Sequence, residues 1–360
     1  MLIGLAGAAS KSDVPVVPPP TVEALRGSRG DVAPLPPEDT VISRVAFGSC
    51  LGQNKPAPIF SQVLARQPRL MVLLGDNVYG DDKTGDPSLP VLRRAYGDLA
   101  QNEYFRSFSA AVPVLPIWDD HDYGLNDVGG EFPHKAESER IFEAFWDVAE
   151  DDPRTSREGV YRKYSFGETG KVLQIILLDT RTFRSKLKRM GWGQFWRKGR
   201  YKASIEYNQS VLGIEQWRWL EAALNEPADL RIVVSSIQIL PTRSGWEHWG
   251  QFPMERAKVL NFLHRRKNVI VVSGDRHWGT MYQDDFGMIE MTTSSLNKPG
   301  KPYYPEKDEL QIRKPVIEVN FGEVEVDWEA RAATLRIVNG EGSVVRKSEF
   351  DFGQQAKPAR

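Results

Sequence analysis

Five short runs of consecutive apolar residues recur along the middle of the chain, and each one leads directly into polar residues. These runs are LMVLLGDNVY, AVPVLPIWDDHD, KVLQIILLDTR, LRIVVSSIQIL and KNVIVVSGDRHWG. Apolar runs without alternation are typical of strands that are buried on both faces. A further strand is expected over residues 41–47, because the turn residues Gly48 and Ser49 follow it.

Segments with helical periodicity lie between these predicted strands. Ile59, Phe60, Val63 and Leu64 fall on one face of a helix that we expect over residues 57–66. AESERIFEAFWDVA and GIEQWRWLEAALN predict two more helices. Buried strands that alternate with helices indicate a layered α/β fold.

The two ends of the chain have different patterns. Residues 316–350 alternate polar and apolar positions around a turn at 339–342, which predicts antiparallel strands with one exposed face. Residues 11–40 are rich in proline and poor in large apolar side chains. We therefore expect residues 1–40 to be a leader or a wrapping arm and residues 41–360 to form a single domain.

The composition of the chain indicates what kind of partner it binds, but it does not indicate a cellular compartment. The chain has 47 Lys and Arg against 48 Asp and Glu, so its charge does not predict a nucleic acid or an anionic membrane as the main partner. Cys50 is the one cysteine, which excludes an intrachain disulfide. No run reaches the roughly 20 apolar residues of a membrane-spanning helix. We expect a small-molecule partner, and the oligomeric state is left open.

The first residues, MLIGLAGAASKSD, have two interpretations. They contain a short apolar run that ends in small residues, but they lack the basic start and the length of an intact secretory signal. If they are the remnant of a longer signal, a periplasmic or extracellular location is expected. If they are an ordinary frayed terminus, the expected location is cytoplasmic.

The polar residues that follow the apolar runs are the strongest functional signal. In α/β sheets, ligands bind beyond the carboxyl ends of the strands, so these residues are expected to meet at one rim. Taken singly, each cluster also fits an ordinary turn, because Gly, Asp, Asn and Ser are favoured there. The clusters are Ser49-Cys50, Gly75-Asp76-Asn77 with Tyr79, Asp119 to Asp122, Asp179-Thr180-Arg181, Ser235-Ser236, and Gly274-Asp275-Arg276-His277.

The donor atoms of these clusters suit one or two metal ions. Carboxylates are typical ligands of calcium, magnesium or manganese, whereas phenolate and thiolate favour iron or another transition metal. Two metal ions that share a carboxylate can hold a phosphoryl group and activate a water for in-line attack. The residues that supply this set are Cys50, Asp76, Tyr79, Asp120, Asp275 and His277.

Five motifs in a fixed order resemble a known family. FGSC, LLGDNVY, WDDHD, LLDTRTFRS and SGDRHWG resemble the PhoD-like alkaline phosphatases and phosphodiesterases of the calcineurin-like metallophosphoesterase superfamily. The resemblance implies a four-layer α-β-β-α sandwich with two mixed sheets and a catalytic domain over residues 41–360. It also implies a metal-dependent hydrolase of phosphate monoesters, diesters or both, in which water is activated at a dinuclear centre.

The resemblance assigns roles to the first two motifs. Asp76 is expected to bridge the two metal ions and to be essential for catalysis. Cys50 and Tyr79 resemble the thiolate and phenolate ligands that the family offers to ferric iron. The free cysteine also fits a buried apolar side chain, and Tyr79 also fits a packed ring with a hydrated hydroxyl.

The later motifs supply the second metal site and the catalytic histidine. Asp120 is expected to bind the second metal ion, and His121 is expected to stabilise the leaving oxygen or the phosphoryl oxygens. Asp275 and His277 correspond to the family's last metal-binding motif. Asn126 is expected to replace an asparagine ligand of longer members.

The chain departs from the longer family members in two respects. Only about 40 proline-rich residues precede the first motif, so we expect a short form without the N-terminal β-sandwich domain. Ser235, Ser236 or Gln238 lies where common relatives have a histidine ligand, which favours oxygen donors and calcium at the second site. The expected cofactors are Fe³⁺ and Ca²⁺, with Mn²⁺, Zn²⁺ and Mg²⁺ as alternatives.

Three residues are expected to contact the substrate: Arg184, Asn77 and Trp278. A guanidinium at Arg184 can bind phosphate oxygens in a bidentate manner, although a loop arginine also fits a surface charge. Asp119 and Asp122 are expected to accept hydrogen bonds that orient His121 or neighbouring ligands.

The remaining histidines, several tryptophans and one basic run have less specific expected positions. The basic run at residues 186–202 predicts an anion-attracting insertion or a solvated loop. The remaining histidines are expected at the surface or in packing, and WEHWG has enough aromatic character to line a pocket. These assignments concern His134, His248, His264, Trp192, Trp196, Trp217 and Trp219.

The motifs and the predicted fold bear on other functions as well. A phospholipase-type or teichoic-acid phosphodiesterase is compatible with the same motifs. A non-catalytic binding protein that keeps the fold is a second alternative, and the retained His121 argues against it. A mononuclear iron oxygenase requires a small β-barrel, which buried strands alternating with helices do not predict.

Overall fold

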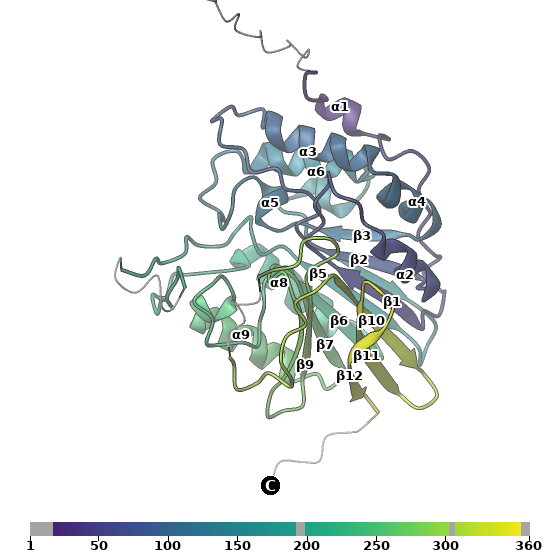
Figure 1. Cartoon of the computed structure of the whole chain (residues 1–360). Helices are drawn as coiled ribbons and strands as arrows, with labels where there is room; N and C mark the ends of the chain where they lie inside the picture. Colours follow the sequence, from purple (N-terminus) through teal and green to yellow (C-terminus); the bar gives the residue numbers. More distant parts are fainter. Residues whose placement is uncertain (1–16, 192–198, 302–306, 354–360) are drawn as a thin grey trace, which may run out of the picture.

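The computed structural model describes residues 17–191, 199–301 and 307–353 of the chain. Two six-stranded sheets form its centre, and helices cover their outer faces (Figure 1). The strand order is β12-β11-β10-β1-β2-β3 in the first sheet and β4-β5-β6-β7-β9-β8 in the second. The result is the predicted four-layer α-β-β-α sandwich with two mixed sheets.

The first sheet combines a parallel and an antiparallel half. Strands β1, β2 and β3 are parallel, and β10 joins β1 in the antiparallel sense before β11 and β12 follow. Its strands are β1 (Arg44–Gly48), β2 (Leu70–Leu74), β3 (Val114–Ile117), β10 (Asn320–Asp327), β11 (Ala332–Asn339) and β12 (Val344–Asp351).

The second sheet has a parallel centre of four strands. Strands β5, β6, β7 and β9 are parallel, and β4 and β8 pair antiparallel at the edges. Its strands are β4 (Arg162–Phe166), β5 (Leu173–Leu178), β6 (Leu230–Ser235), β7 (Val269–Ser273), β8 (Gly279–Gln283) and β9 (Ile289–Thr293).

The helices fall into two groups. One group lies beside the first sheet: α1 (Val22–Leu25), α2 (Ile59–Ala65), α3 (Pro90–Gln101), α4 (Glu103–Ala111), α5 (Asp120–Tyr123) and α6 (Lys135–Phe145). The other group, α8 (Gly213–Asn225) and α9 (Pro253–His264), packs on the outer face of the second sheet. Two short 3₁₀ helices are η1 (Pro153–Ser156) and η2 (Trp249–Gln251).

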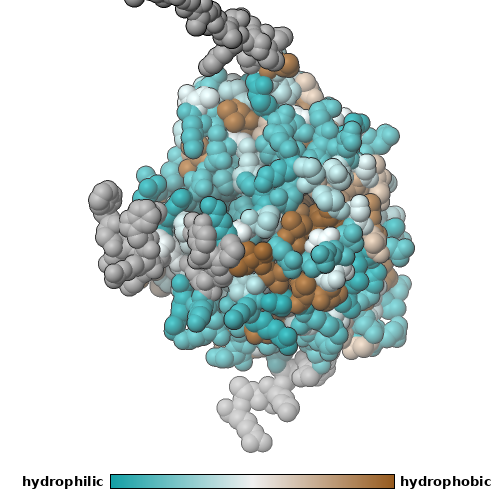
Figure 2. Space-filling view, viewed as in Figure 1, coloured by the Kyte–Doolittle hydropathy of each residue, from teal (hydrophilic) through white to brown (hydrophobic). Residues whose placement is uncertain are grey.

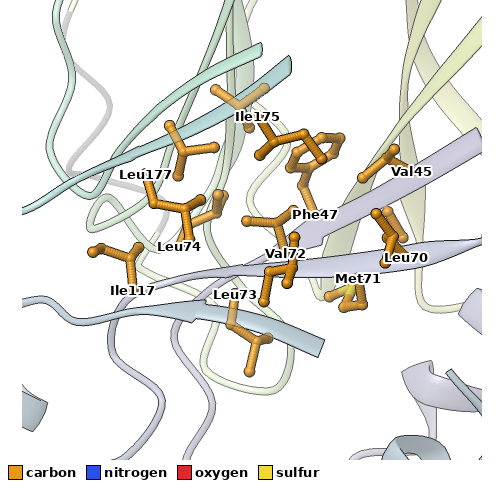
Figure 3. Close-up of a cluster of buried hydrophobic side chains, with 14 of the residues drawn as sticks. Val45, Phe47, Leu70, Met71, Val72, Leu73, Leu74, Ile117, Ile175 and Leu177 are labelled. Carbon is orange, nitrogen blue, oxygen red and sulfur yellow. The ribbon is translucent and has the colours of Figure 1, made fainter. Parts of the chain in front are cut away.

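Strand β5 is apolar throughout because its two faces pack in two different cores. Ile175 and Leu177 belong to the core between the sheets, whereas Ile176 and Leu178 pack in a second core with α8 and α9. In Figure 3, Val72 of β2 points toward the β5 side chains. Because successive side chains point to opposite faces, a strand between two layers must be apolar throughout.

The predicted elements are largely confirmed, with three differences. The expected helix over residues 136–149 ends at Phe145, and Asp147 takes a positive φ of 53°. The antiparallel C-terminal strands are present, but successive residues of β10 are buried over most of its length, so both of its faces are covered and not one alone. Some elements were not predicted: helices α3, α4 and α9, and strands β4, β8 and β9.

The proline-rich segment contacts the helices of the first group. Leu25 is fully buried, and Arg29 donates to the Phe145 carbonyl at 2.9 Å and pairs with Asp147 at 3.0 Å. Residues 17–40 therefore run along the domain surface near α6. The division of the chain at residue 40 stays a prediction.

The surface is mainly hydrophilic. Figure 2 shows that hydrophilic side chains cover most of the face in view, with apolar side chains gathered near its centre. Within the described ranges, no helix is both long and apolar enough to cross a bilayer.

The core between the sheets predicts a large stability difference between two isoleucines. Ile175 is fully buried, whereas Ile205 is 84% exposed. Ile175→Ala should lower the free energy of unfolding by about 3 kcal/mol through lost burial and a residual cavity. Ile205→Ala should change it by about 0.5 kcal/mol or less. Urea unfolding followed by tryptophan fluorescence measures both, and equal losses would contradict the assigned core.

Candidate metal centre

The carboxyl ends of the parallel strands bring the predicted ligands together. Cys50 follows β1 and Asp76 follows β2, and the Leu51 amide donates to the Asp76 carbonyl at 2.9 Å. The second sheet approaches closely at Gly274, where a Cβ would lie 2.7 Å from the Ser49 hydroxyl and 2.9 Å from a backbone carbonyl oxygen of β2. Only glycine therefore permits this approach, which carries Asp275 and His277 to the rim.

One donor group gathers sulfur, oxygen and nitrogen atoms. Donor atoms of Cys50, Asp76 and His277 lie within 4.8 Å of one another. The Tyr79 hydroxyl lies 2.9 Å from Asp76 Oδ2 and 3.4 Å from His277 Nε2. Burial, reinforced by the Asp76 carboxylate, raises the pKa of both the Cys50 thiol and the Tyr79 phenol well above their ordinary values. Their ionised forms therefore require a cation nearby.

A second donor group shares Asp76 with the first. Donor atoms of Asp76, Asp120 and His121 also lie within 4.8 Å of one another. Oδ1 of Asp76 and Oδ1 of Asp120 are buried and have no hydrogen-bond partner among the described residues. A buried carboxylate oxygen without a partner is costly, so these two orphaned atoms fit metal ions.

Four of the predicted ligands have strained backbones. The φ angles are 56° at Cys50, 49° at Asp76, 67° at Asp275 and 57° at His277. Non-glycine residues rarely adopt positive φ, and such strain concentrates at functional sites where the surrounding structure imposes it. Each of these side chains is thus held at the rim by its turn.

His277 is oriented by contacts with Lys298 and Ser294. Its Nδ1 lies 2.6 Å from the Lys298 carbonyl, and its backbone N–H donates to the Ser294 hydroxyl. A carbonyl can only accept, so Nδ1 carries the proton and Nε2 presents a lone pair. Burial lowers the pKa of His277 and favours this neutral form. Ser294 also contacts Cys50 Sγ at 3.1 Å.

His121 is oriented by a carboxylate that was not predicted. Its Nδ1 lies 2.6 Å from Asp81 Oδ2, and Oδ1 of Asp81 accepts the Asn126 amide at 2.7 Å. Burial lowers the pKa of His121, but the Asp120 and Asp76 charges and the Asp81 hydrogen bond outweigh burial and raise it to about 11. Cations bound to Asp76 and Asp120 would offset part of that field, whereas the Asp81 contact would remain.

The flanking carboxylates of the WDDHD motif face away from the donor groups. Asp119 accepts hydrogen bonds from Arg181 at 2.6 Å and from Ser236 at 2.7 Å. Asp122 accepts the backbone amides of Asp119 and Asn77 at 2.6 and 3.1 Å. Asp119 and Asp122 therefore fix the turns that carry Asp76 and Asp120, and His121 is held by another residue.

A cavity of about 270 Å³ opens beside these donors. Six of the residues predicted to bind metal or substrate line it: Asp120, His121, Asn126, Asp275, His277 and Trp278. Asp275 and Asn126 both line the cavity, and Asp275 does not belong to the compact groups of His, Cys, Asp and Glu donors found among the described residues. The full lining is Asp120, His121, Asn126, Asp127, Arg200, Trp246, Glu247, Asp275, Arg276, His277, Trp278, Gly300 and Lys301.

Two predicted substrate residues lie behind the cavity wall. Arg184 is fully buried, pairs with Glu247 at 2.8 Å and donates to the Asp127 carbonyl at 2.7 Å. Asn77 donates through Nδ2 to the Ile117 carbonyl at 2.9 Å. Neither side chain lines the cavity, because each is committed to contacts inside the fold.

The expected oxygen donors after β6 are also committed elsewhere. Ser235 donates to the Ile237 carbonyl, Ser236 to Asp119, and Gln238 to Thr292. None of these three side chains lines the cavity. Because they lie away from the cavity, these three side chains give no support to an oxygen-rich second site, and calcium at that site stays a prediction.

Sequence reasoning missed several residues at the site. Glu247 and Asp127 form a third donor group with Asp120, and Arg276 lies over the Trp278 ring at 4.7 Å. Glu247 lies in the WEHWG stretch, whose aromatic character predicted a pocket lining, and Arg276 lies in the SGDRHWG motif. Asp81 carried no such signal, because its role depends on a contact with His121.

Some of the tryptophan and basic residues singled out in the sequence lie outside the described residues. Trp192, Trp196 and residues 192–198 of the basic run lie outside them. Trp217 belongs to the core and Trp219 packs against it, as predicted. The histidines occupy packing or surface positions: His248 is buried, His264 lies 2.6 Å from Asp284, and His134 precedes α6.

Comparison with solved structures finds the same fold in three proteins. PhoD is similar with a TM-score of 0.66 and 17% identity, over 89% of this chain and 70% of PhoD. Purple acid phosphatase PPD1 from yellow lupin seeds has a TM-score of 0.61 and 12% identity, over 88% of this chain and 55% of its own. GAP50, the anchor in the inner membrane complex of Plasmodium, has a TM-score of 0.57 and 15% identity, over 88% and 90%.

Comparison of sequences defines the family. No curated protein sequence matches this chain significantly. A family model described as PhoD-like phosphatase matches residues 45–337, a range that contains every predicted metal ligand. Because this match covers most of the chain, the protein belongs to the PhoD-like phosphatase family.

Proposed function

We propose that this protein hydrolyses phosphate esters at a two-metal centre in which both ions share Asp76. The observation that carries the proposal is that Asp76 belongs to both donor groups and keeps a buried Oδ1 without a hydrogen-bond partner among the described residues. His121 lines the same cavity. Phosphomonoesters, phosphodiesters or both are the substrates.

The donor sets favour two different ions. Cys50, Tyr79 and His277 would hold one ion together with Asp76, and thiolate and phenolate ligands favour Fe³⁺ there. Asp120 and Asp275 would hold the second ion, with Asn126 as an additional oxygen donor, and hard oxygen ligands favour Ca²⁺. When bound, such a pair of ions activates water and neutralises charge on the phosphoryl oxygens.

The residues of the chain itself act on the leaving group and the phosphoryl oxygens. Asp81 holds Nδ1 of His121, so Nε2 is the nitrogen that can donate to the departing oxygen. Arg276 lines the cavity over Trp278, so it is the better candidate for the anion-binding role first predicted for Arg184. Trp278 would pack against the alcohol portion of the ester.

A non-catalytic role is the second candidate. GAP50, described as the anchor in the inner membrane complex of Plasmodium, has the same fold, and a fold by itself does not determine function. The shared Asp76 and the oriented His121 favour catalysis instead. Assays with p-nitrophenyl phosphate and its bis ester, each with added iron and calcium, distinguish the two. Phospholipase-type and teichoic-acid phosphodiesterase activities can be tested in the same panel.

Asp76→Asn should abolish hydrolysis while the fold is retained. The amide has no negative charge to share between two cations, so metal content should fall and kcat should drop by at least about 100-fold. Elemental analysis and ester hydrolysis measure the two effects, and circular dichroism controls for folding. Asp285→Asn, on an exposed loop, is the matched control. Full activity in Asp76→Asn would show that the shared-ligand assignment is wrong.

Tyr79→Phe tests the identity of the first metal ion without an activity assay. If Tyr79 binds ferric iron, the purified protein should show a visible phenolate-to-iron charge-transfer band. The substitution removes the phenolate oxygen, so the phenolate band should disappear and leave only the absorption of an iron-bound Cys50 thiolate, while the iron content changes much less. A protein that contains iron and keeps its band in Tyr79→Phe would contradict the ligand assignment.

Asp81→Asn should impair His121 more for poor leaving groups than for good ones. The expected loss in kcat is about 10- to 100-fold with alkyl phosphate esters, because their leaving oxygen needs a proton. p-Nitrophenolate leaves without one, so the loss with p-nitrophenyl esters should be smaller. The ratio of kcat for the two substrates measures this difference, and an equal loss for both would indicate a merely structural role for Asp81.

A further inference from the structure

Four strongly exposed apolar side chains cluster on one face of the molecule. Ile205, Tyr207, Ile214 and Met254 are 84%, 95%, 69% and 63% exposed. Among the described residues, six large apolar side chains are more than 60% exposed, and these are four of them. Such a cluster on a soluble surface usually marks an interaction site.

Hydrogen bonds tie the segments that carry these side chains to one another. The Ser204 amide donates to the Gln251 carbonyl at 2.8 Å, close to Met254. The Val211 amide and the Trp217 indole both donate to Glu255, at 3.2 and 2.7 Å. The loop before α8, the start of α8 and the start of α9 therefore form one continuous surface, which we call the apolar patch.

Basic side chains surround the apolar patch. Residues 186–191 and 199–206 contain five basic residues and one acidic residue, although the whole chain is nearly neutral. Lys188 pairs with Glu206 between Ile205 and Tyr207. On the other side, Lys258 lies 3.8 Å from the centre of the Trp217 ring. The surroundings of the patch thus carry a positive charge.

We infer that the apolar patch and its basic surroundings dock this protein on an anionic lipid bilayer. Apolar side chains that enter the interface while lysines reach the head groups are characteristic of peripheral membrane binding. A protein partner fits less well, since lysine is depleted in protein interfaces. Arg200 lines the cavity and precedes Ile205 by five residues in the chain, so docking would bring the cavity near the head groups. The inference does not depend on the proposed hydrolytic activity.

Co-sedimentation with vesicles tests the inference. The full chain should bind vesicles of phosphatidylcholine with 30% phosphatidylglycerol, more weakly as salt increases, and should bind pure phosphatidylcholine far less. Ile205→Ser with Tyr207→Ser should weaken binding by at least about tenfold, because the inserted apolar surface is lost. Lys186→Gln with Lys202→Gln should weaken binding at low salt by about tenfold or more.

Phe286→Ser provides the matched control. Phe286 is 80% exposed but lies in the turn between β8 and β9, so its loss should leave vesicle binding unchanged. Circular dichroism and hydrolysis of a soluble ester should be the same in every variant, since none of these residues belongs to the metal centre. The inference would be overturned if anionic vesicles failed to bind the protein, if both double variants bound normally, or if the control lost binding equally.

Discussion

Crowding of buried carboxylates is the constraint on which the centre of this structure depends. Asp76, Asp119, Asp120 and Asp122 are almost fully buried at the ends of β2 and β3. Carboxylates this close repel one another strongly in a low dielectric unless cations or N–H groups offset their charge. The Arg181 guanidinium offsets the charge of Asp119, and backbone amides donate hydrogen bonds to Asp122 and to one oxygen of Asp120. Among the described residues, Oδ1 of Asp76 and Oδ1 of Asp120 keep no hydrogen-bond partner, and both residues belong to donor groups of the candidate metal centre.

The same charges explain why two arginines lie deep inside the fold. Arg181 and Arg184 both pair with Glu247 at the cavity wall, and all three side chains are fully or almost fully buried. Losing one partner would leave an uncompensated buried charge, which costs several kcal/mol. The network therefore holds Glu247 and Asp119 in fixed positions close to Asp120. It stiffens the wall against which a substrate would bind.

The backbone provides the second means of fixing the centre. Positive φ angles at Cys50 and Asp76 turn these side chains out of the first sheet, and those at Asp275 and His277 do so from the second. The glycine before Asp275 allows the two rims to approach within contact distance. Strain at each position is tolerable because the packed sheets on both sides over-determine the turns.

The sequence by itself determined which residues reach the rim. Uninterrupted apolar runs fix the strands, and the residue after each run must lie at a carboxyl end, so Cys50, Asp76 and His277 could be named in advance. Only the tertiary structure decided which polar group meets which. Arg184 and Arg276 both follow an aspartate at a strand end, yet one is buried against Glu247 and the other lines the cavity. Their partners come from distant segments, and only the packing of the two sheets brings those segments together.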